Sequence, residues 1–173
     1  MAFATIDVTK GITGTIPVAN GGTGLASGTT GQFLKFTGTT TLASSTSEIQ
    51  SKAGYFTYNM SSGSNGDTQA ITGVGFTPKA VFINCLVNAG EPWSVGMQGD
   101  GTGTYDKNSL TWYNTANNNE MTYNRDNAFG LWTSGSDILR GSITTFGADG
   151  FTVTYTHQNS PSGTAEFMYL AVR

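Results

Sequence analysis

The N-terminal residues alternate between apolar and polar side chains and carry few of the large residues that a globular core needs. Over residues 6–18, Ile or Val stands at every second position except Lys10 and Gly14. This period predicts an extended strand with one buried face. A lone strand has no core to bury that face against, so the stripe predicts a partner surface in other copies of the chain or in a larger assembly. The expected interface consists of Ile6, Val8, Ile12, Ile16 and Val18.

The sequence as a whole predicts three segments, the first of which contains the alternating residues 6–18. Residues 1–42, which are rich in glycine, form an extended assembly or docking arm; residues 43–53 form a Ser/Thr-rich linker; and residues 54–173 form one β domain. The last segment reads as about nine short strands separated by turn residues, and it contains no long stretch of helical period. The chain is therefore predicted to be all-β, its arm followed by an antiparallel, jelly-roll-like two-sheet β-sandwich.

Individual strands and turns within residues 54–173 can be predicted from local patterns. The run Ala80–Val87 is almost continuously apolar, which is typical of a central strand covered on both faces. Asn65-Gly66 and Asp149-Gly150 each predict a hairpin turn. Residues 159–164 have turn chemistry throughout and predict a third hairpin connection, between the last two strands.

Composition limits the classes of partner. Charged residues make up 11% of the 173 residues and the formal net charge is -3, so there is no basic footprint for nucleic acid or anionic membrane. No run approaches the roughly 20 apolar residues of a membrane span, and no secretory signal is recognised. We therefore expect no nucleic-acid partner and no membrane insertion, and synthesis in a cytoplasm. The single cysteine, Cys85, lies in an apolar run and is predicted to be buried and unreactive.

Enzymatic chemistry is not predicted. The chain has one histidine, His157, at the end of a predicted strand, and it has no Gly-x-Ser-x-Gly motif. We interpret His157 as an exposed or capping residue. The acidic residues lie in polar loops and are expected to be solvated. The sequence therefore predicts no catalytic residues, no metal site and no cofactor.

The stretch from Trp112 to Trp132 has the aromatic and amide composition of a sugar-binding site. Aromatic rings stack against the apolar faces of sugars, and amides bind the hydroxyls. The alternative is that Trp112 and Trp132 are core residues and the asparagines form turns; Trp93 is interpreted as a core residue at the start of a strand. The candidate ligand-binding residues are Trp112, Tyr113, Tyr123, Asn124 and Trp132.

Two parts of the chain also carry a resemblance. Residues 14–24, Gly-Thr-Ile-Pro-Val-Ala-Asn-Gly-Gly-Thr-Gly, and residues 31–40 resemble the repeated segment of bacteriophage tail-fibre and related virion-fibre proteins. Residues 71–82 and 146–153 resemble the opening and the closing portions of a β-rich module of phage structural proteins. Between them, residues 88–137 match nothing that we recognise.

The resemblance implies an extended, usually trimeric element of a virion. We therefore expect a non-enzymatic bacteriophage structural protein, namely a head fibre, a capsid decoration protein or a tail-fibre component. It would be made in the cytoplasm of a bacterial host, form a homotrimer, contact other capsid or tail proteins and lie on the virion surface. The alternative function is a carbohydrate-binding module of a tail fibre that recognises a host-surface glycan.

Overall fold

The chain divides into two units, Met1–Glu48 and Ile49–Arg173, and the division falls inside the predicted linker. The structure is a computed structural model that describes residues 22, 23, 25, 28–39, 41–45, 49–87, 92–101, 106–115 and 118–173, without the side chains of 114, 115, 118 and 119. The predicted assembly stripe, Ile6, Val8, Ile12, Ile16 and Val18, lies outside the described residues. Its role as an interface therefore stays a prediction.

The described part of the first unit contains one β-hairpin. Strand β1 (Phe33–Gly38) pairs antiparallel with β2 (Thr41–Ser45), and the pairing is irregular between Phe36 and Gly38. The sequence analysis expected a continuous extended arm over residues 1–42 and did not predict this hairpin. The aromatic side chains of Phe33 and Phe36 are exposed.

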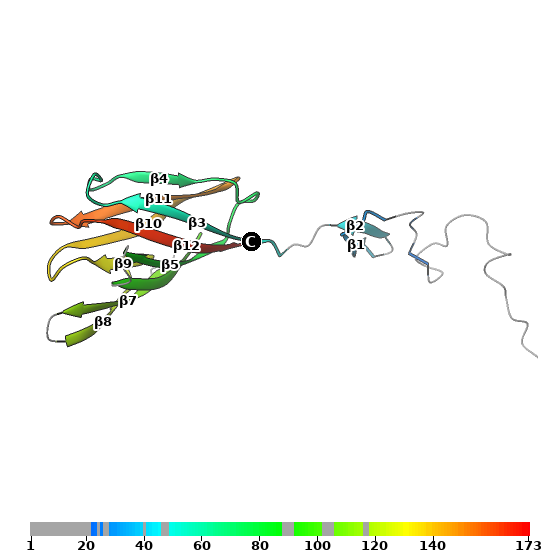
Figure 1. Cartoon of the computed structure of the whole chain (residues 1–173). Coiled ribbons are helices and arrows are strands. Elements are labelled where there is room, and N and C mark those ends of the chain that lie inside the picture. Colours follow the sequence, from blue (N-terminus) through cyan, green and yellow to red (C-terminus); the bar gives the residue numbers. More distant parts are fainter. Residues whose placement is uncertain are drawn as a thin grey trace, which may run out of the picture. The chain divides into compact units, whose positions relative to one another are not determined.

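The second unit is an antiparallel β-sandwich of two sheets (Figure 1). The six-stranded sheet has the order β3 (Ser51–Asn59), β12 (Thr164–Val172), β5 (Ala80–Val87), β6 (Trp93–Gly99), β7 (Lys107–Thr115) and β8 (Asn118–Asn124). The four-stranded sheet has the order β4 (Thr68–Ile71), β11 (Gly150–Gln158), β10 (Ile138–Gly147) and β9 (Phe129–Trp132). The prediction of an all-β sandwich is confirmed, and its first strand begins at Ser51 rather than after residue 54.

The core between the sheets is largely aromatic. Phe56 of β3 stacks on Phe167 of β12 with ring centroids 4.6 Å apart, and Phe129 of β9 meets Phe167 edge-on at 4.8 Å. Such paired rings add to the hydrophobic free energy of the buried area. Cys85 is buried in the same core, as predicted, and burial raises the pKa of its thiol. This unit therefore encloses a core of its own.

Two of the three predicted hairpins are instead crossings between the sheets. The loop with Asn65-Gly66 leads from β3 in one sheet to β4 in the other, and residues 159–163 lead from β11 to β12. Gly66 has a φ of 90° and donates its N–H to the carbonyl of Tyr155, so the loop is fastened to β11 and not to a hairpin partner. The turn residues reverse the chain as expected, but tertiary contacts decide which sheet receives the next strand.

The third predicted hairpin is confirmed, because β10 and β11 pair through Gly147 and Gly150. Its Asp149 carboxylate accepts hydrogen bonds from the N–H groups of Gly73 (3.0 Å) and Gly75 (2.7 Å), both of which have a positive φ. These two bonds hold the pKa of Asp149 below its ordinary value. The hairpin thereby fixes the loop that follows β4.

The inner face of β6 and β7 carries small and polar side chains instead of large apolar ones. Ser94 Oγ accepts a hydrogen bond from the N–H of Gly130 (3.2 Å), and Thr111 Oγ1 donates to the carbonyl of Gly130 (2.7 Å). Strand β9 therefore lies with its backbone against this face. Gly96, on the same face, faces the carbonyl of Ala128 and has no room for a side chain.

A buried amide joins the two sheets next to this contact. Gln98 of β6 is 4% exposed; its Nε2 donates to the carbonyl of Ile143 (2.6 Å), and its Oε1 accepts from the N–H of Ile143 (2.7 Å). Ile143 stands where the pairing of β10 with β11 shifts register, and β9 pairs with β10 only as far as Gly141. The Gln98 side chain therefore supplies both hydrogen bonds that a further strand would have made.

The two ends of the second unit lie together. The N–H of Arg173 donates to the carbonyl of Gln50 at 2.9 Å, and β3 pairs with β12 from Ser51 opposite Val172 to Asn59 opposite Thr164. The chain thus enters and leaves the sandwich at the same end, marked C in Figure 1.

Candidate functional site

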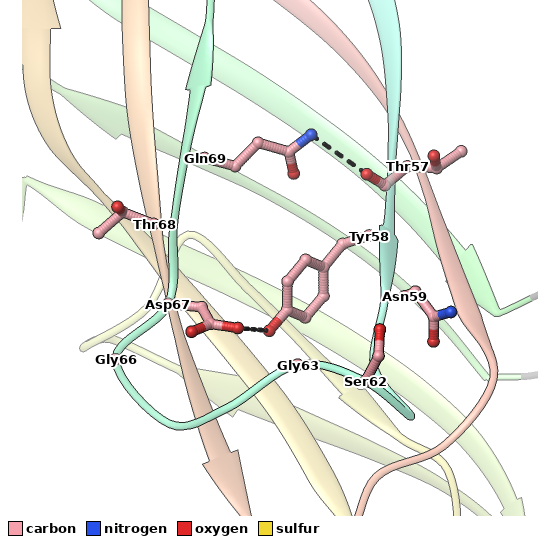
Figure 2. Close-up of a pocket in the computed structure, with 9 residues that line it drawn as sticks. All are labelled: Thr57, Tyr58, Asn59, Ser62, Gly63, Gly66, Asp67, Thr68 and Gln69. Carbon is pink, nitrogen blue, oxygen red and sulfur yellow. Dashed lines mark hydrogen bonds between the residues drawn. The ribbon is translucent and has the colours of Figure 1, made fainter.

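A polar hollow lies at the open side of the sandwich, where the edge strands β3 and β4 face each other without pairing. Its volume is about 570 Å³, and Figure 2 shows its walls rising from β3, from β4 and from the loop between them. The lining residues are Thr57, Tyr58, Asn59, Ser62, Gly63, Gly66, Asp67, Thr68 and Gln69. Hydroxyl and amide groups dominate this set, together with one aromatic ring and one carboxylate.

Two side chains that line the hollow, Tyr58 and Asp67, form a hydrogen-bonded series with a third, His157. Tyr58 points from β3 towards Asp67, and its hydroxyl donates to Asp67 Oδ2 at 3.0 Å (Figure 2). His157 Nε2 lies 3.0 Å from the same hydroxyl oxygen. Because the phenol has a single proton, His157 is placed to donate its Nε2–H to that oxygen. Asp67 also accepts a hydrogen bond from the N–H of Ser64 at 2.7 Å.

The ring of Tyr58 is held in place by the opposite sheet. It stacks on Tyr155 of β11 with centroids 3.7 Å apart and an interplanar angle of 10°. Tyr155 in turn donates its hydroxyl to Gln69 Oε1 (2.7 Å), and Gln69 Nε2 donates to the carbonyl of Thr57 (3.2 Å). The two unpaired strand edges are therefore joined by side chains, which keeps the hollow open and fixes its shape.

The electrostatics favour fixed hydrogen-bonding roles over proton transfer near neutral pH. Burial, followed by the bond to Asp67, raises the pKa of Tyr58 to about 12. The backbone N–H of Ser64, followed by the Tyr58 hydroxyl, lowers the pKa of Asp67. Burial lowers the pKa of His157, against the attraction of Asp67. At pH 7 the imidazole of His157 and the phenol of Tyr58 are therefore neutral, and Asp67 is a carboxylate. These three groups are suited to binding hydroxyl groups.

We expect a Tyr58→Phe variant to be less stable at pH 7 by about 1 kcal/mol, since a hydrogen bond to a charged acceptor is lost at a half-open site. The phenol pKa is raised in the folded state, so its contribution is complete below pH 10 and is lost as the pH rises from 10 towards 12. The variant should therefore lose less stability over this range than the unaltered protein. Urea unfolding at pH 7 and at rising pH measures both effects.

The control for this experiment is Thr144→Val, which removes an exposed, non-titrating hydroxyl of β10 that lies 2.8 Å from Thr154 Oγ1. It should leave stability at pH 7 and its alkaline dependence unchanged. Equal effects of the two variants would contradict the assigned role of Tyr58.

The candidate ligand residues from the sequence do not form one cluster, because side chains alternate across a strand. Trp112 and Tyr123 face the outside of the six-stranded sheet, whereas Tyr113 faces the other way and stacks on Trp132 with centroids 5.2 Å apart. Asn124 accepts a hydrogen bond from the N–H of Asp126 (2.7 Å) and so shapes the turn after β8. Ligand binding by these residues remains a prediction, but no single site contains all five.

Trp93 is a correction to the sequence analysis. It does not enter the core but lies half-buried on the outer face of the six-stranded sheet, stacked on Trp112 with centroids 6.3 Å apart. The core position of β6 next to it is taken by Ser94, which is fully buried.

The sequence analysis missed Tyr58 and Asp67. Their partner His157 is 99 residues from Tyr58 along the chain, and the contact depends on the pairing of β11 with β4, which no local pattern predicts. His157, predicted to be an exposed or capping residue, is half-buried and hydrogen-bonded. The only signal was the polar loop between two strands, and such loops are common.

Other kinds of site are not found among the described residues. There, no three His, Cys, Asp or Glu side chains come together as metal ligands would. The same residues include no helix that could cross a membrane. No match was found to a protein-family model, to a curated protein or to a solved structure.

Proposed function

We propose that this chain is a non-enzymatic structural protein of a bacteriophage virion: a head fibre, a capsid decoration protein or a tail-fibre component. Its N-terminal arm docks or trimerises on the particle, and its sandwich is displayed at the surface. The resemblance of residues 14–24 and 31–40 to virion-fibre segments motivates this function. The observation that supports it is the organisation of the chain, because the unit Ile49–Arg173 encloses a core of its own residues and Met1–Glu48 is a separate unit, to which assembly is assigned.

The test is whether the chain is part of the particle. Phage particles from a host culture that expresses this chain are purified on a density gradient and examined by mass spectrometry and by immunogold electron microscopy with an antibody against the sandwich. We expect the chain in the particle fraction and gold at the particle surface, with labelling lost when the antibody is first absorbed with recombinant protein. A chain found in the soluble lysate but not in particles would refute the proposal.

Binding of a host-surface glycan is a second candidate function, favoured by the hydroxyl and amide lining of the hollow and by the ring of Tyr58. The full chain is applied to a glycan array together with a Ser62→Trp variant, which fills the hollow. The matched control is Ser136→Trp, in an exposed loop that does not line it. Binding that only Ser62→Trp abolishes supports this function, and an array without any bound glycan refutes it.

A further inference from the structure

The two outer faces of the sandwich differ in chemistry. On the four-stranded sheet, the exposed or half-buried outward positions of β10 and β11 include the polar residues Arg140, Ser142, Thr152, Thr154 and Thr156, and the one apolar outward residue of β10, Ile138, is buried. This is the composition expected of a sheet with one face in the core and the other in water. The outer face of the six-stranded sheet carries large apolar side chains instead.

The apolar side chains form rows across that sheet. Two rows run through all six strands and a third runs through five, and the apolar side chains in them are interrupted by Thr57, Asn84, Asn108 and Glu166. The first row is Tyr55, Met168, Asn84, Val95, Leu110 and Tyr123; the second is Thr57, Glu166, Leu86, Trp93, Trp112 and Met121; the third is Ala53, Leu170, Phe82, Met97 and Asn108. We call this surface the apolar face.

Much of the apolar face is open to solvent in the single chain. Met168 is 65% exposed, Met121 62% and Tyr55 59%, and the side chains of Phe82, Val95, Tyr123 and Leu170 are also exposed. Scattered apolar residues on a protein surface need no explanation, but a contiguous set of this kind marks an interaction surface.

The central strand supports the same conclusion. The sequence of β5 predicts a strand covered on both faces, and β5 does lie inside the six-stranded sheet, between β12 and β6. Its inward side chains, such as Val81 and Ile83, are buried, while the outward Phe82 is 43% exposed. The sequence of β5 predicts that both of its faces are covered, but the sandwich covers only the inner face and leaves the outer face exposed.

The size of the apolar face is sufficient for a stable contact. An aromatic side chain offers about 150–250 Å² of surface, so the three exposed rings contribute on the order of 300 Å². The four exposed aliphatic and methionine side chains add a comparable area. The sum approaches the roughly 800 Å² that each partner buries in a standard protein interface.

The charge of the apolar face indicates its occupant. Among the outward strand positions that the structure describes on this sheet, Glu166 is the only side chain charged at neutral pH, and at the β8 edge the guanidinium of Arg125 lies 5.6 Å from the centroid of the Tyr123 ring. A surface for a partner with a charged contact area would need complementary charges. A face with so little charge, in contrast, can pair with itself, and Glu166 and the edge residue Arg125 are the charged groups that such a pairing has to accommodate.

We propose that the apolar face packs against the same face of other copies of this chain, around a common symmetry axis, and closes a homo-oligomer through the sandwich. This interface is distinct from the N-terminal stripe and goes beyond the proposed function, because it does not depend on a virion. Closed symmetry buries the face in every copy and leaves no free apolar surface.

The test measures the mass of the full chain in solution by size exclusion with light scattering. The variant Val95→Lys/Leu170→Lys places two charges on the apolar face, and the control Thr152→Lys/Thr154→Lys places the same two charges on the polar outer face. We expect an oligomer for the unaltered chain and the control, and a folded monomer for the apolar-face variant. Circular dichroism checks that each variant is folded.

A milder variant keeps the proposal testable if the lysines impair folding. Val95→Thr/Leu170→Thr retains β-forming residues and should raise the dissociation constant of the oligomer about tenfold or more. A third variant, Ile12→Asp/Ile16→Asp, alters only the arm. A monomeric unaltered chain, an apolar-face variant of unchanged mass, or dissociation caused by the arm variant alone would each overturn the proposal.

Discussion

Replacing Gly96 with alanine is expected to destabilise the sandwich by about 3 kcal/mol or more, because two strands would have to move apart. A Cβ at this position would meet the carbonyl oxygen of Ala128 and lie 2.8 Å from the Cβ of Ser109. The first of these is a backbone atom that cannot rotate away. Strand β9 would therefore have to move away from β6, with loss of the hydrogen bonds that the Gly130 N–H donates to Ser94 and that its carbonyl accepts from Thr111.

Thermal and urea unfolding measure this effect, and the midpoint temperature should fall by about 10 °C or more. The matched control is Gly135→Ala, since a Cβ at Gly135 meets no atom within 4 Å and the backbone there has no positive φ. The control should unfold like the unaltered protein. A Gly96→Ala variant of normal stability would show that β9 does not lie against β6 as described.

Replacing Gln98 with leucine should lower the free energy of unfolding by about 2–5 kcal/mol. Leucine has a similar volume but leaves the N–H and the carbonyl of Ile143 buried without partners, and each unpaired backbone group costs about 1–3 kcal/mol. Urea unfolding followed by tryptophan fluorescence provides the measurement. The result tests whether the contact of Gln98 with Ile143 of the other sheet stabilises the protein through its hydrogen bonds or through the volume of the side chain.

Gln158→Leu is the matched control for Gln98→Leu. Gln158 lies exposed on β11, and its Oε1 accepts one hydrogen bond, from Arg140 at 2.8 Å. Its loss should change stability by less than about 1 kcal/mol, because water replaces an exposed hydrogen bond. Equal losses in the two variants would mean that the buried amide has no special role.

Local sequence patterns were sufficient for most strands of the sandwich, though not for β1 and β2. Ala80–Val87 was predicted residue for residue, and the alternation of Phe151, Val153 and Tyr155 with threonines marked β11 correctly. These patterns succeed because a strand in a sandwich has one face against the core, and period 2 reports that directly. In β12 the outward positions Met168 and Leu170 are apolar as well as the inward ones, and this pattern in the sequence already indicates the apolar face.

Contacts distant in sequence could not be predicted in the same way. Asn65-Gly66 specifies a reversal of the chain but not the sheet that β4 joins, so it predicts a hairpin where the chain crosses between the sheets. The contact of Tyr58 with His157 depends on that crossing. The role of Gln98 depends on the end of the β9–β10 pairing at Gly141, two residues before Ile143, whose backbone groups the amide then binds. Each of these features follows from the packing of the two sheets, which is a property of the whole unit.

The shared end of β3 and β12 has a practical consequence for attaching other molecules to this sandwich. A fusion partner joined after Arg173 would emerge beside Gln50, where the chain enters the sandwich. The opposite pole carries the loops 61–66 and 159–163, which are tied together by the hydrogen bond from the Gly163 N–H to Ser61 Oγ. A peptide inserted into one of these loops would lie at the opposite end from Gln50, and such exposed loops are the sites where insertions are best tolerated.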